Sequence, residues 1–416
     1  MGGGISGLSL GFFLSKQNKY EIIVLEKEKR VGGFLGTDQP SGFLFERGPR
    51  TFRKQSDALL QLVEEIGLQE ELISSSPQAN RRFLSLNNKL VPIPSLELLL
   101  SCLPALAKEW CIPPSCNEET VWDFAVRRFN TQVAQKVFDP MALGIFAGDS
   151  KELSMNAAFP SLKLQELQYG SLTKAWFSKT PSAKGLLSFK NGTETLIQRL
   201  EHILRQQIVL EEEVKTLQFS NQEVVVTTNK GAWRADYLFS TLPAFVNAAL
   251  FAPLDKEISA LFATVNYKSL TLVHLGYREM SHVPKQLLNG FGYLVPTLEQ
   301  RNGLGVVFDS SLFAEHNSYP NEVRLTIMLK EGGIHEAKEE VKRYLGIKTT
   351  PNVALCTHVH NAIPQYTLGH ERRIAELTRR LHLQFGAFCF LGNYVSGVSV
   401  NDCIALSSTL SKSWKG

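Results

Sequence analysis

The sequence predicts an α/β fold: a Rossmann-like, two-dinucleotide-binding domain joined to a domain with an antiparallel sheet and interrupted by a helical insertion. Three observations predict it. The chain opens on the glycine pattern G-x-G-x-x-G at residues 2–7, strand patterns are replaced by large apolar residues at 94–169, and alternating strand patterns return at 187–360. Such a succession of strand and helix patterns is typical of multidomain α/β chains.

The composition indicates a folded chain with balanced charge. At 416 residues it exceeds one ordinary hydrophobic core, so we expect two or three domains. The net charge of only +4 disfavours nucleic acid as a partner. We see no secretory signal peptide and no stretch with the roughly 18 apolar residues of a spanning helix. We therefore expect a cytoplasmic protein.

The six cysteines lack the spacing of a disulfide framework, which suits a reducing compartment. Cys356, His358 and His360 fall on one face of a predicted strand, and these residue types can bind metal. No carboxylates, and no residues that would hydrogen-bond and orient the histidines, are evident nearby. We therefore interpret the three as polar positions on a sheet face and predict no metal site.

The N-terminal stretch predicts a phosphate-binding turn. In G-x-G-x-x-G the glycines let the chain turn, let a pyrophosphate approach the backbone and let the helix pack on a strand. Residues 21–25 have the composition of a strand, and Glu26 ends it about 20 residues beyond the glycines, where this fold places a ribose-binding acid. The turn residues are Gly2, Gly3, Gly4, Ile5, Ser6 and Gly7.

Only Met1 precedes this glycine pattern, although the pattern should follow an apolar strand. That strand is central in the sheet, so its absence predicts exposed edges on its neighbours and an unseated phosphate loop. We hypothesise that the native protein starts upstream of Met1, which mass spectrometry of the native N-terminus would test.

Residues 26–33 follow the pattern E-x-x-x-R-x-G-G, which favours FAD over a nicotinamide cofactor. FAD runs on past the first βαβ unit, so Arg30 would neutralise phosphate and the paired glycines would admit the ribityl chain. The next segment, 45–49, reads F-E-x-G-P, and in flavin amine oxidase-like proteins this segment leads the chain beneath the isoalloxazine ring. Arg50 is either a turn residue or a cation near the flavin or an acidic substrate.

Hydrophobic periodicity and turn residues predict the remaining elements. Helices are expected at 55–73 (with a break at Gly67), 96–106, 121–129, 133–143, 194–206 and 336–344, and a hairpin at 81–92. Strands are expected at 208–210, 214–219, 223–228, 237–244, 270–277, 305–309 and 322–328. We assign 1–80, 183–250 and 361–416 to an FAD-binding domain, 81–94 and 251–360 to a substrate-binding domain, and 95–182 to the insertion.

Two apolar segments have more than one interpretation. Residues 93–104 could dip into one membrane leaflet, line an apolar substrate entrance or form an internal core helix. Residues 290–296 place aromatic and aliphatic side chains on a glycine-containing strand, which suits either a flat ligand or ordinary core packing.

Two C-terminal segments carry a family resemblance. Residues 362–370 read A-x-P-Q-Y-x-x-G-H and residues 397–404 read G-V-x-V-N-D-C-I. With them the chain resembles the protoporphyrinogen oxidase family of oxygen-dependent flavoenzymes, from Gly2 to Ile404. The resemblance implies hydride removal from a porphyrinogen to flavin N5, and reoxidation by oxygen to give hydrogen peroxide. It implies no general base, and we interpret His370 as structural.

The resemblance also implies site residues. At positions 398–400 it implies a helix start whose amides would face the flavin pyrimidine. Arg82 would clamp a propionate, although the neighbouring Arg81 could take that part. Beyond the turn residues, the FAD contacts are Glu26, Lys27, Arg30, Gly32, Gly33, Phe34, Gly48, Pro49, Arg50, Thr51, Val214, Val398, Ser399 and Val400. The remaining substrate contacts are Phe291, Gly292, Leu294 and Met328.

Alternatives stay open at this point. Coproporphyrinogen III carries four propionates rather than two, and Arg81 or Arg50 would supply an extra cation for it. A flavin amine oxidase or carotenoid desaturase would share the fold, and a non-enzymatic porphyrin carrier would have lost the flavin. The expected partners are a porphyrinogen and oxygen. A peripheral contact with the inner face of the cytoplasmic membrane and a homodimer are further expectations.

Overall fold

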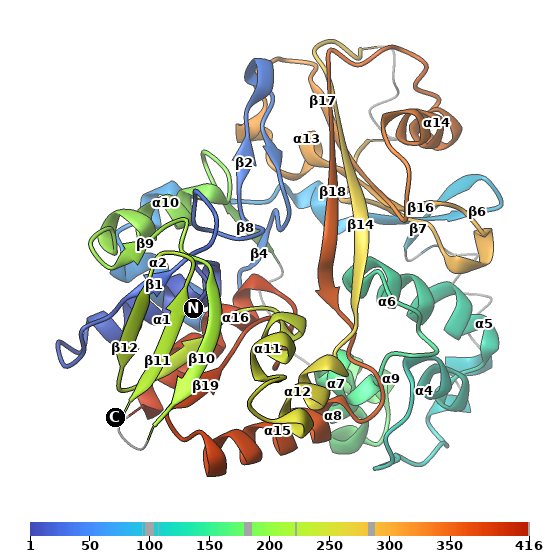
Figure 1. Ribbon diagram of the computed structural model, residues 1–416. Helices are drawn as coiled ribbons and strands as arrows, with labels where there is room; N and C mark the ends of the chain where they lie inside the picture. Colours follow the sequence, from blue (N-terminus) through green and yellow to red (C-terminus); the bar gives the residue numbers. More distant parts are fainter. Residues whose placement is uncertain are drawn as a thin grey trace.

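The computed structural model describes residues 1–93, 95, 104–106, 108–178, 185–220, 223–281 and 288–414. Figure 1 shows an α/β region that holds the first and last helices, a large sheet that includes two long strands, and a group of helices below that sheet. This arrangement confirms the predicted α/β class. No helix in the described ranges has the length and apolar content that crossing a bilayer requires.

The α/β region is built on short parallel strand pairs. Strand β1 (Val24–Leu25) pairs with β9 (Ile208–Val209), and β13 (Leu238–Ser240) pairs with β19 (Phe388–Phe390). Four helices share one apolar core beside them, and Leu8, Leu62, Leu200 and Ile404 from these helices are completely buried. The helices are α1 (Ile5–Ser15), α2 (Asp57–Glu65), α10 (Glu194–Ile203) and α16 (Val400–Ser413). The break predicted at Gly67 (φ +70°) in the segment 55–73 is confirmed, whereas β5 at Leu72–Ser74 replaces the helix expected beyond it.

The first two residues lie between the two parallel strand pairs. The Gly2 amide donates to Leu25 O at 2.8 Å, the terminal amino group of Met1 donates to Phe239 O at 2.7 Å, and the Thr241 amide donates to Met1 O at 2.9 Å. The expectation of an unseated phosphate loop is therefore wrong: the backbone of Met1 and Gly2 supplies the hydrogen bonds that hold the loop to β1 and β13.

An aromatic layer covers the other end of the α/β region. The antiparallel strands β10 (Val214–Phe219), β11 (Val224–Thr228) and β12 (Ala232–Ala235) pack with helices α11 (Ala244–Phe251), α12 (Lys256–Ala263) and α15 (His370–Gln384). Phe219 makes ring contacts with Phe251, Phe385 and Phe388 at centroid distances of 6.2, 4.8 and 6.2 Å. These contacts join three of the elements through side chains that are far apart in the sequence.

The large sheet has seven strands in the order β18-β14-β17-β16-β15-β6-β7. It differs from the predicted antiparallel sheet at one pair, because β15 runs parallel to β6. Helix α14 (Ile334–Leu345) packs on the face that carries Val273 and Leu275. The strands are β6 (Arg82–Leu86), β7 (Lys89–Ile93), β14 (Tyr267–Tyr277), β15 (Gly292–Leu294), β16 (Gly303–Phe308), β17 (Val323–Leu329) and β18 (Val353–Pro364).

The helical insertion covers part of the other face of this sheet. Helix α6 (Asp139–Phe146) lies against the sheet through Leu143, which joins an apolar cluster with Leu270, Leu272 and Leu304. The remaining helices include α4 (Val121–Arg128), the π-helical turn η4 (Ala134–Phe138), α7 (Met155–Ala158), α8 (Pro160–Tyr169) and α9 (Leu172–Ser178). Most of the apolar segment 93–104 lies outside the described residues, so its three interpretations stay open.

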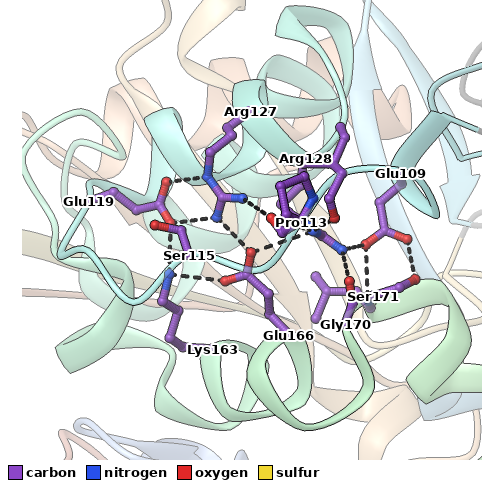
Figure 2. A network of polar contacts seen from close by, with 12 residues as sticks. Glu109, Pro113, Ser115, Glu119, Arg127, Arg128, Lys163, Glu166, Gly170 and Ser171 are labelled. Atoms are coloured by element: carbon purple, nitrogen blue, oxygen red, sulfur yellow. Dashed lines mark hydrogen bonds and ion pairs between the residues drawn. The ribbon is translucent and has the colours of Figure 1, made fainter.

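A charged network lies inside the insertion (Figure 2). The side chains of Arg128, Glu109 and Glu166 are completely buried, and Arg128 contacts both carboxylates. Glu109 also accepts from the Leu172 amide at 2.9 Å and from Thr173 Oγ1 at 2.5 Å, so it caps the start of α9. The other members are Arg127, Glu119 and Lys163, which give the network three positive and three negative charges. The network ties the segment around Glu109 to α4, α8 and α9.

Candidate functional site

The structure brings the two glycine motifs together. Gly4 and Gly32 form a parallel β-bridge, and the Gly32 amide donates to Gly3 O at 2.8 Å. Both Gly32 (φ +107°) and Gly33 (φ +57°) have left-handed backbone conformations that other residues adopt at a cost. A Cβ on Gly33 would lie 3.5 Å from the Cα of Gly4. The second motif therefore forms one wall of the loop that the first motif begins.

Glu26 lies under this loop. One carboxylate oxygen accepts from the Gly3 amide at 2.7 Å and the other accepts from the Glu28 amide at 2.9 Å. Its neighbour Lys27 is exposed and pairs with Glu28. Glu26 thus fixes the end of β1 against the glycine turn, at the position where the sequence predicts the ribose-binding acid.

The glycine turn leaves open space beside the N-terminus of α1. A Cβ on Gly7 would lie 2.0 Å from Gly2 O, so only glycine allows α1 to start this close to the turn. A Cβ on Gly4 would meet no atom within 4 Å, although Gly4 is the N-cap of α1. The turn is closed on the protein side and open beside the helix N-terminus, where the first N–H groups and the helix dipole favour a phosphate. The residues present therefore fit FAD.

Arg30 shapes the second glycine motif. Its guanidinium donates to the backbone carbonyls of Val31, Gly33 and Leu35 at 3.0, 2.9 and 3.0 Å. The turn that follows exposes Phe34, of which 45% is accessible. The predicted phosphate contact of Arg30 stays a prediction, whereas its contacts to the turn are direct.

The segment after β3 (Phe45–Glu46) is packed against the second glycine motif. A Cβ on Gly48 would lie 2.5 Å from Phe34 O, so this approach again requires glycine. Glu46 is buried and accepts from the Thr193 amide at 2.8 Å. Burial raises the pKa of the Glu46 carboxyl to about 7. Pro49 and Thr51 continue this segment, half-buried, toward β4 (Phe52–Arg53).

Arg50 joins the α/β region to the large sheet. Its guanidinium lies 2.8 Å from Asp309, and these side chains are only 11% and 9% exposed. Asp309 also accepts from Thr326 Oγ1 at 2.6 Å, and Thr326 Oγ1 lies 2.9 Å from His274 Nδ1. Burial lowers the pKa of His274 to about 4, so this histidine is neutral near pH 7. Arg50 is therefore an ion-paired residue at a buried contact rather than a free cation.

The N-terminus of α16 is held by a set of contacts that the sequence did not reveal. Ser399 caps the helix and Asp402 completes the capping box. Asn401 exchanges hydrogen bonds with the backbone of Arg53 at 3.0 and 3.1 Å, and the Arg53 guanidinium pairs with Asp402. The predicted cofactor segment 398–400 thus lies against β4 and, through the packing of α16 on α1, near the glycine turn.

The predicted substrate residues lie on adjacent strands of the large sheet. Leu294 is directly opposite Gly305, Gly305 is opposite Met328, and Met328 is opposite Leu272. Directly opposed residues share a sheet face, so these four form one row beneath α6. A Cβ on Gly144 of α6 would lie 2.9 Å from the Leu294 side chain, which places the helix close above the row.

Gly292 keeps this face flat. Its φ of +143° lies in a region that favours glycine, and a Cβ there would lie 2.0 Å from Val306 O. Arg82 is directly opposite Gly292, and its guanidinium lies 5.2 Å from the ring centre of Phe291. Phe291 and Met328 pack in one apolar cluster. The structure thus brings the five predicted substrate residues to one part of the sheet.

The remaining predicted residues lie elsewhere. Val214 begins β10 opposite Thr228, near the buried Glu212 that accepts from Thr228 and Trp233. Cys356 and His358 lie on β18, and His358 Nδ1 is 3.0 Å from Thr271 Oγ1. Within the described ranges no three metal-ligating side chains are grouped as a metal ion would require.

The chain is similar to a group of known flavoproteins. Residues 5–406 match the family described as flavin containing amine oxidoreductase. The chain is 32% identical to protoporphyrinogen oxidase of Homo sapiens, with 97% of this chain and 95% of that protein covered. It is 27% identical to chloroplastic protoporphyrinogen oxidase 1 of Arabidopsis thaliana (97% and 85% covered) and 24% identical to coproporphyrinogen III oxidase of Bacillus subtilis (97% and 94% covered).

Solved structures share the fold. A crystal structure of a protein from Exiguobacterium sp. 255-15 superposes with a TM-score of 0.87 at 22% identity, covering 99% of this chain and 97% of that one. Cyclohexylamine oxidase from Brevibacterium oxydans gives a TM-score of 0.73 at 15% identity, with 99% and 97% covered. At these identities the likeness shows the fold alone.

Proposed function

We propose that this chain oxidises protoporphyrinogen IX to protoporphyrin IX with oxygen as the electron acceptor. The premise is that the chain belongs to the flavin-containing amine oxidoreductase family and, within it, is related to protoporphyrinogen oxidases. The chain is an FAD oxidoreductase. The observation that carries the substrate proposal is the row of Leu294, Gly305, Met328 and Leu272, with Arg82 at its edge. A flat apolar floor with a cation beside it suits a macrocycle that ends in propionates.

The charges at this face favour a substrate with few carboxylates. Arg50 is paired with Asp309, and His274 is neutral near pH 7 because burial lowers its pKa to about 4. Arg82 has no carboxylate partner among the described residues. With Arg50 ion-paired, the guanidinium of Arg82 suits the two propionates of protoporphyrinogen better than the four of coproporphyrinogen, the alternative substrate, for which Arg81 would have to supply the extra cation. The relative from Bacillus subtilis that bears the latter name is also less similar, at 24% against 32% identity.

In the proposed reaction the residues of this chain orient the substrate and the cofactor and exclude water. Bound FAD supplies the hydride acceptor. The row on the sheet and α6, which packs against it through Leu143, would form one wall of the substrate site, and Arg82 would fix the edge of the macrocycle. The glycine turn and Glu26 would hold the pyrophosphate and ribose end of the cofactor, and the α16 N-terminus would present amides to the pyrimidine end. We assign no general base, because the cofactor would carry the hydride chemistry.

The test is turnover by the purified full-length protein. Protoporphyrinogen IX and coproporphyrinogen III are supplied separately under air, and porphyrin fluorescence and hydrogen peroxide are followed together. We expect fluorescence and peroxide to rise with protoporphyrinogen IX. A protein that carries FAD but oxidises only coproporphyrinogen III would overturn the substrate proposal. A protein without flavin would fit the carrier alternative instead.

Replacement of Arg82 by alanine should raise the KM for protoporphyrinogen IX by roughly tenfold to a hundredfold, because a charge-assisted contact of about 1.5–3 kcal/mol is lost. The flavin absorbance of the purified variant should equal that of the wild type, since Arg82 lies on the sheet and not beside the glycine turn. Arg81→Ala is the matched control and should leave the KM unchanged. Equal KM values for wild type and Arg82→Ala would show that the propionate clamp lies elsewhere.

We also propose a peripheral membrane contact through the insertion. Leu164 and Leu167 on α8 are 63% and 42% exposed, and Trp176 on α9 is 69% exposed. Leu164 and Leu167 are three positions apart and therefore share one helix face. Apolar side chains that gather on neighbouring helices support contact with a bilayer surface. Homodimerisation and a cytoplasmic location stay predictions.

The double variant Leu164→Glu, Leu167→Glu should float with phosphatidylethanolamine–phosphatidylglycerol vesicles at least about tenfold less than the wild type, because burial of each leucine contributes about 1.5–3 kcal/mol. Leu383→Glu is the matched control, since Leu383 is 68% exposed but lies on α15. Equal flotation of the double variant and the control would refute this contact. Release of native protein by detergent but not by high salt would support apolar burial.

A further inference from the structure

Tyr366 lies behind the loop that leads into α16. Its hydroxyl donates to Asn393 O at 2.6 Å and accepts from the Gly397 amide at 2.9 Å. These two backbone groups stand near opposite ends of the loop between β19 and α16. Tyr366 is only 2% exposed, so the hydroxyl end of both hydrogen bonds is shielded from water. A single hydroxyl therefore sets the distance between the two ends of this loop.

The ring of Tyr366 is fixed by His370. The two rings stack with centroids 4.2 Å apart and planes 13° apart. His370 Nε2 lies 2.8 Å from the carbonyl oxygen of Tyr394, and because a carbonyl only accepts, Nε2 carries the hydrogen. Burial lowers the pKa of His370 to about 4, so the imidazole is neutral and its tautomer is set by this bond. The histidine thus contacts both the tyrosine ring and the loop that the tyrosine holds.

Two further contacts fix Tyr366 from the insertion. The Ser154 amide donates to Tyr366 O at 2.7 Å, and the Phe146 ring lies 5.6 Å from the Tyr366 ring. Tyr366 therefore touches the insertion on one side and the loop before α16 on the other. The side chain cannot move without loss of contacts in both places.

The loop that Tyr366 holds continues directly into the start of α16. Gly397 has φ +149°, and a Cβ there would lie 2.5 Å from the Asp402 carboxylate, so the turn needs glycine. Ser399 follows two residues later and caps the helix. Any shift of the Gly397 amide is therefore passed to the first turn of α16, where the N–H groups and the helix dipole point outward.

We infer that Tyr366 is a positioning residue for the flavin: it fixes the N-terminus of α16 against the pyrimidine end of FAD, and His370 holds its ring in place. The inference rests on the proposed function, in which residues 398–400 face that end of the cofactor. Negative charge develops at the pyrimidine when the flavin is reduced, and fixed N–H dipoles stabilise that charge more than mobile ones. The structure thereby gives the tyrosine and histidine of the A-x-P-Q-Y-x-x-G-H segment a role in flavin chemistry.

Tyr366→Phe tests the inference, because it keeps the ring and removes both hydrogen bonds. We expect the reduction potential of the bound flavin to become more negative, and the affinity of apo-protein for FAD to fall about tenfold, which corresponds to about 1.4 kcal/mol. Tyr277→Phe is the matched control: Tyr277 is 2% exposed, and its hydroxyl has no hydrogen-bond partner among the described residues. The control should match the wild type in both measurements.

The outcomes separate this inference from the proposed function. If Tyr366→Phe has the wild-type potential and FAD affinity, Tyr366 does not position the flavin, even if the melting temperature falls. If Tyr366→Phe does not fold, His370→Gln replaces it and should shift the potential in the same direction, and an unshifted potential would overturn the inference. A wild-type protein that holds no FAD, or that holds FAD but oxidises no porphyrinogen, would contradict the proposed function instead.

Discussion

Replacement of Gly4 by alanine should leave the apo-protein folded and lower its affinity for FAD by about a hundredfold, or about 2.7 kcal/mol. The fold should tolerate the methyl group because a Cβ at this position meets no atom within 4 Å. The affinity should fall because that open space lies beside the N-terminus of α1, where the pyrophosphate would approach the backbone. Titration of apo-protein with FAD, followed by flavin fluorescence, gives the affinity.

Alanine substitutions at two other glycines allow the Gly4→Ala result to be interpreted. Gly386→Ala, in the turn before β19, is the control for the added methyl group. A Cβ there would make an ordinary contact of 3.4 Å with His382 O. It should bind FAD like the wild type. Gly7→Ala should lower both FAD affinity and thermal stability, because its Cβ would lie 2.0 Å from Gly2 O and force the turn apart. If Gly4→Ala binds FAD with wild-type affinity, the pyrophosphate does not lie beside Gly4.

Replacement of Arg128 by methionine should lower the free energy of unfolding by about 3–5 kcal/mol, because it leaves the buried Glu109 and Glu166 without their shared cation. Both Arg128 and Glu109 are completely buried, so water cannot replace the lost partner (Figure 2). The loss should appear as a lower urea midpoint, and limited proteolysis should cut first within the insertion.

The double variant Glu109→Met, Arg128→Met should recover part of this loss, because removing both charges leaves fewer unpaired groups than removing one. Arg234→Met is the exposed control: the Arg234 side chain is 70% exposed in its pair with Glu223, and such surface pairs contribute at most about 1 kcal/mol. If Arg128→Met unfolds at the same urea concentration as Arg234→Met, the buried network does not hold the insertion together.

Local signals in the sequence were sufficient to predict the position of many helices and strands. Strand β10 covers Val214–Phe219 and was predicted at 214–219, and helix α14 covers Ile334–Leu345 around the predicted 336–344. The buried positions of α14, among them Ala337, Val341 and Tyr344, recur with the period of a helix, so the pattern alone predicts this helix. Within the segment 55–73 the predicted break at Gly67 is confirmed, but the helix predicted beyond it is wrong, because the chain there makes a short turn and joins a small sheet. The predicted domain boundaries stay a proposal.

Contacts between distant residues could not be predicted in this way. Arg50 and Asp309 are 259 positions apart, and Tyr366 and Gly397 belong to two motifs with no sequence feature that joins them. From the sequence, Arg50 was either a turn residue or a cation near the flavin or an acidic substrate, and the pairing with Asp309 could not be predicted. Each partner is an ordinary polar residue in its own segment, so its role depends on what the fold places opposite it.

By itself the sequence determined the glycine turn, its acid Glu26 and the family resemblance, because each depends on residue types at short, fixed spacings. The tertiary structure decided that the space beside Gly4 is open and that beside Gly7 is closed, that Met1 and Gly2 hold the loop between two strand pairs, and that Tyr366 supports the start of α16. Those features depend on through-space distances between segments, and the spacing of residues along a chain carries no information about them until the chain is folded.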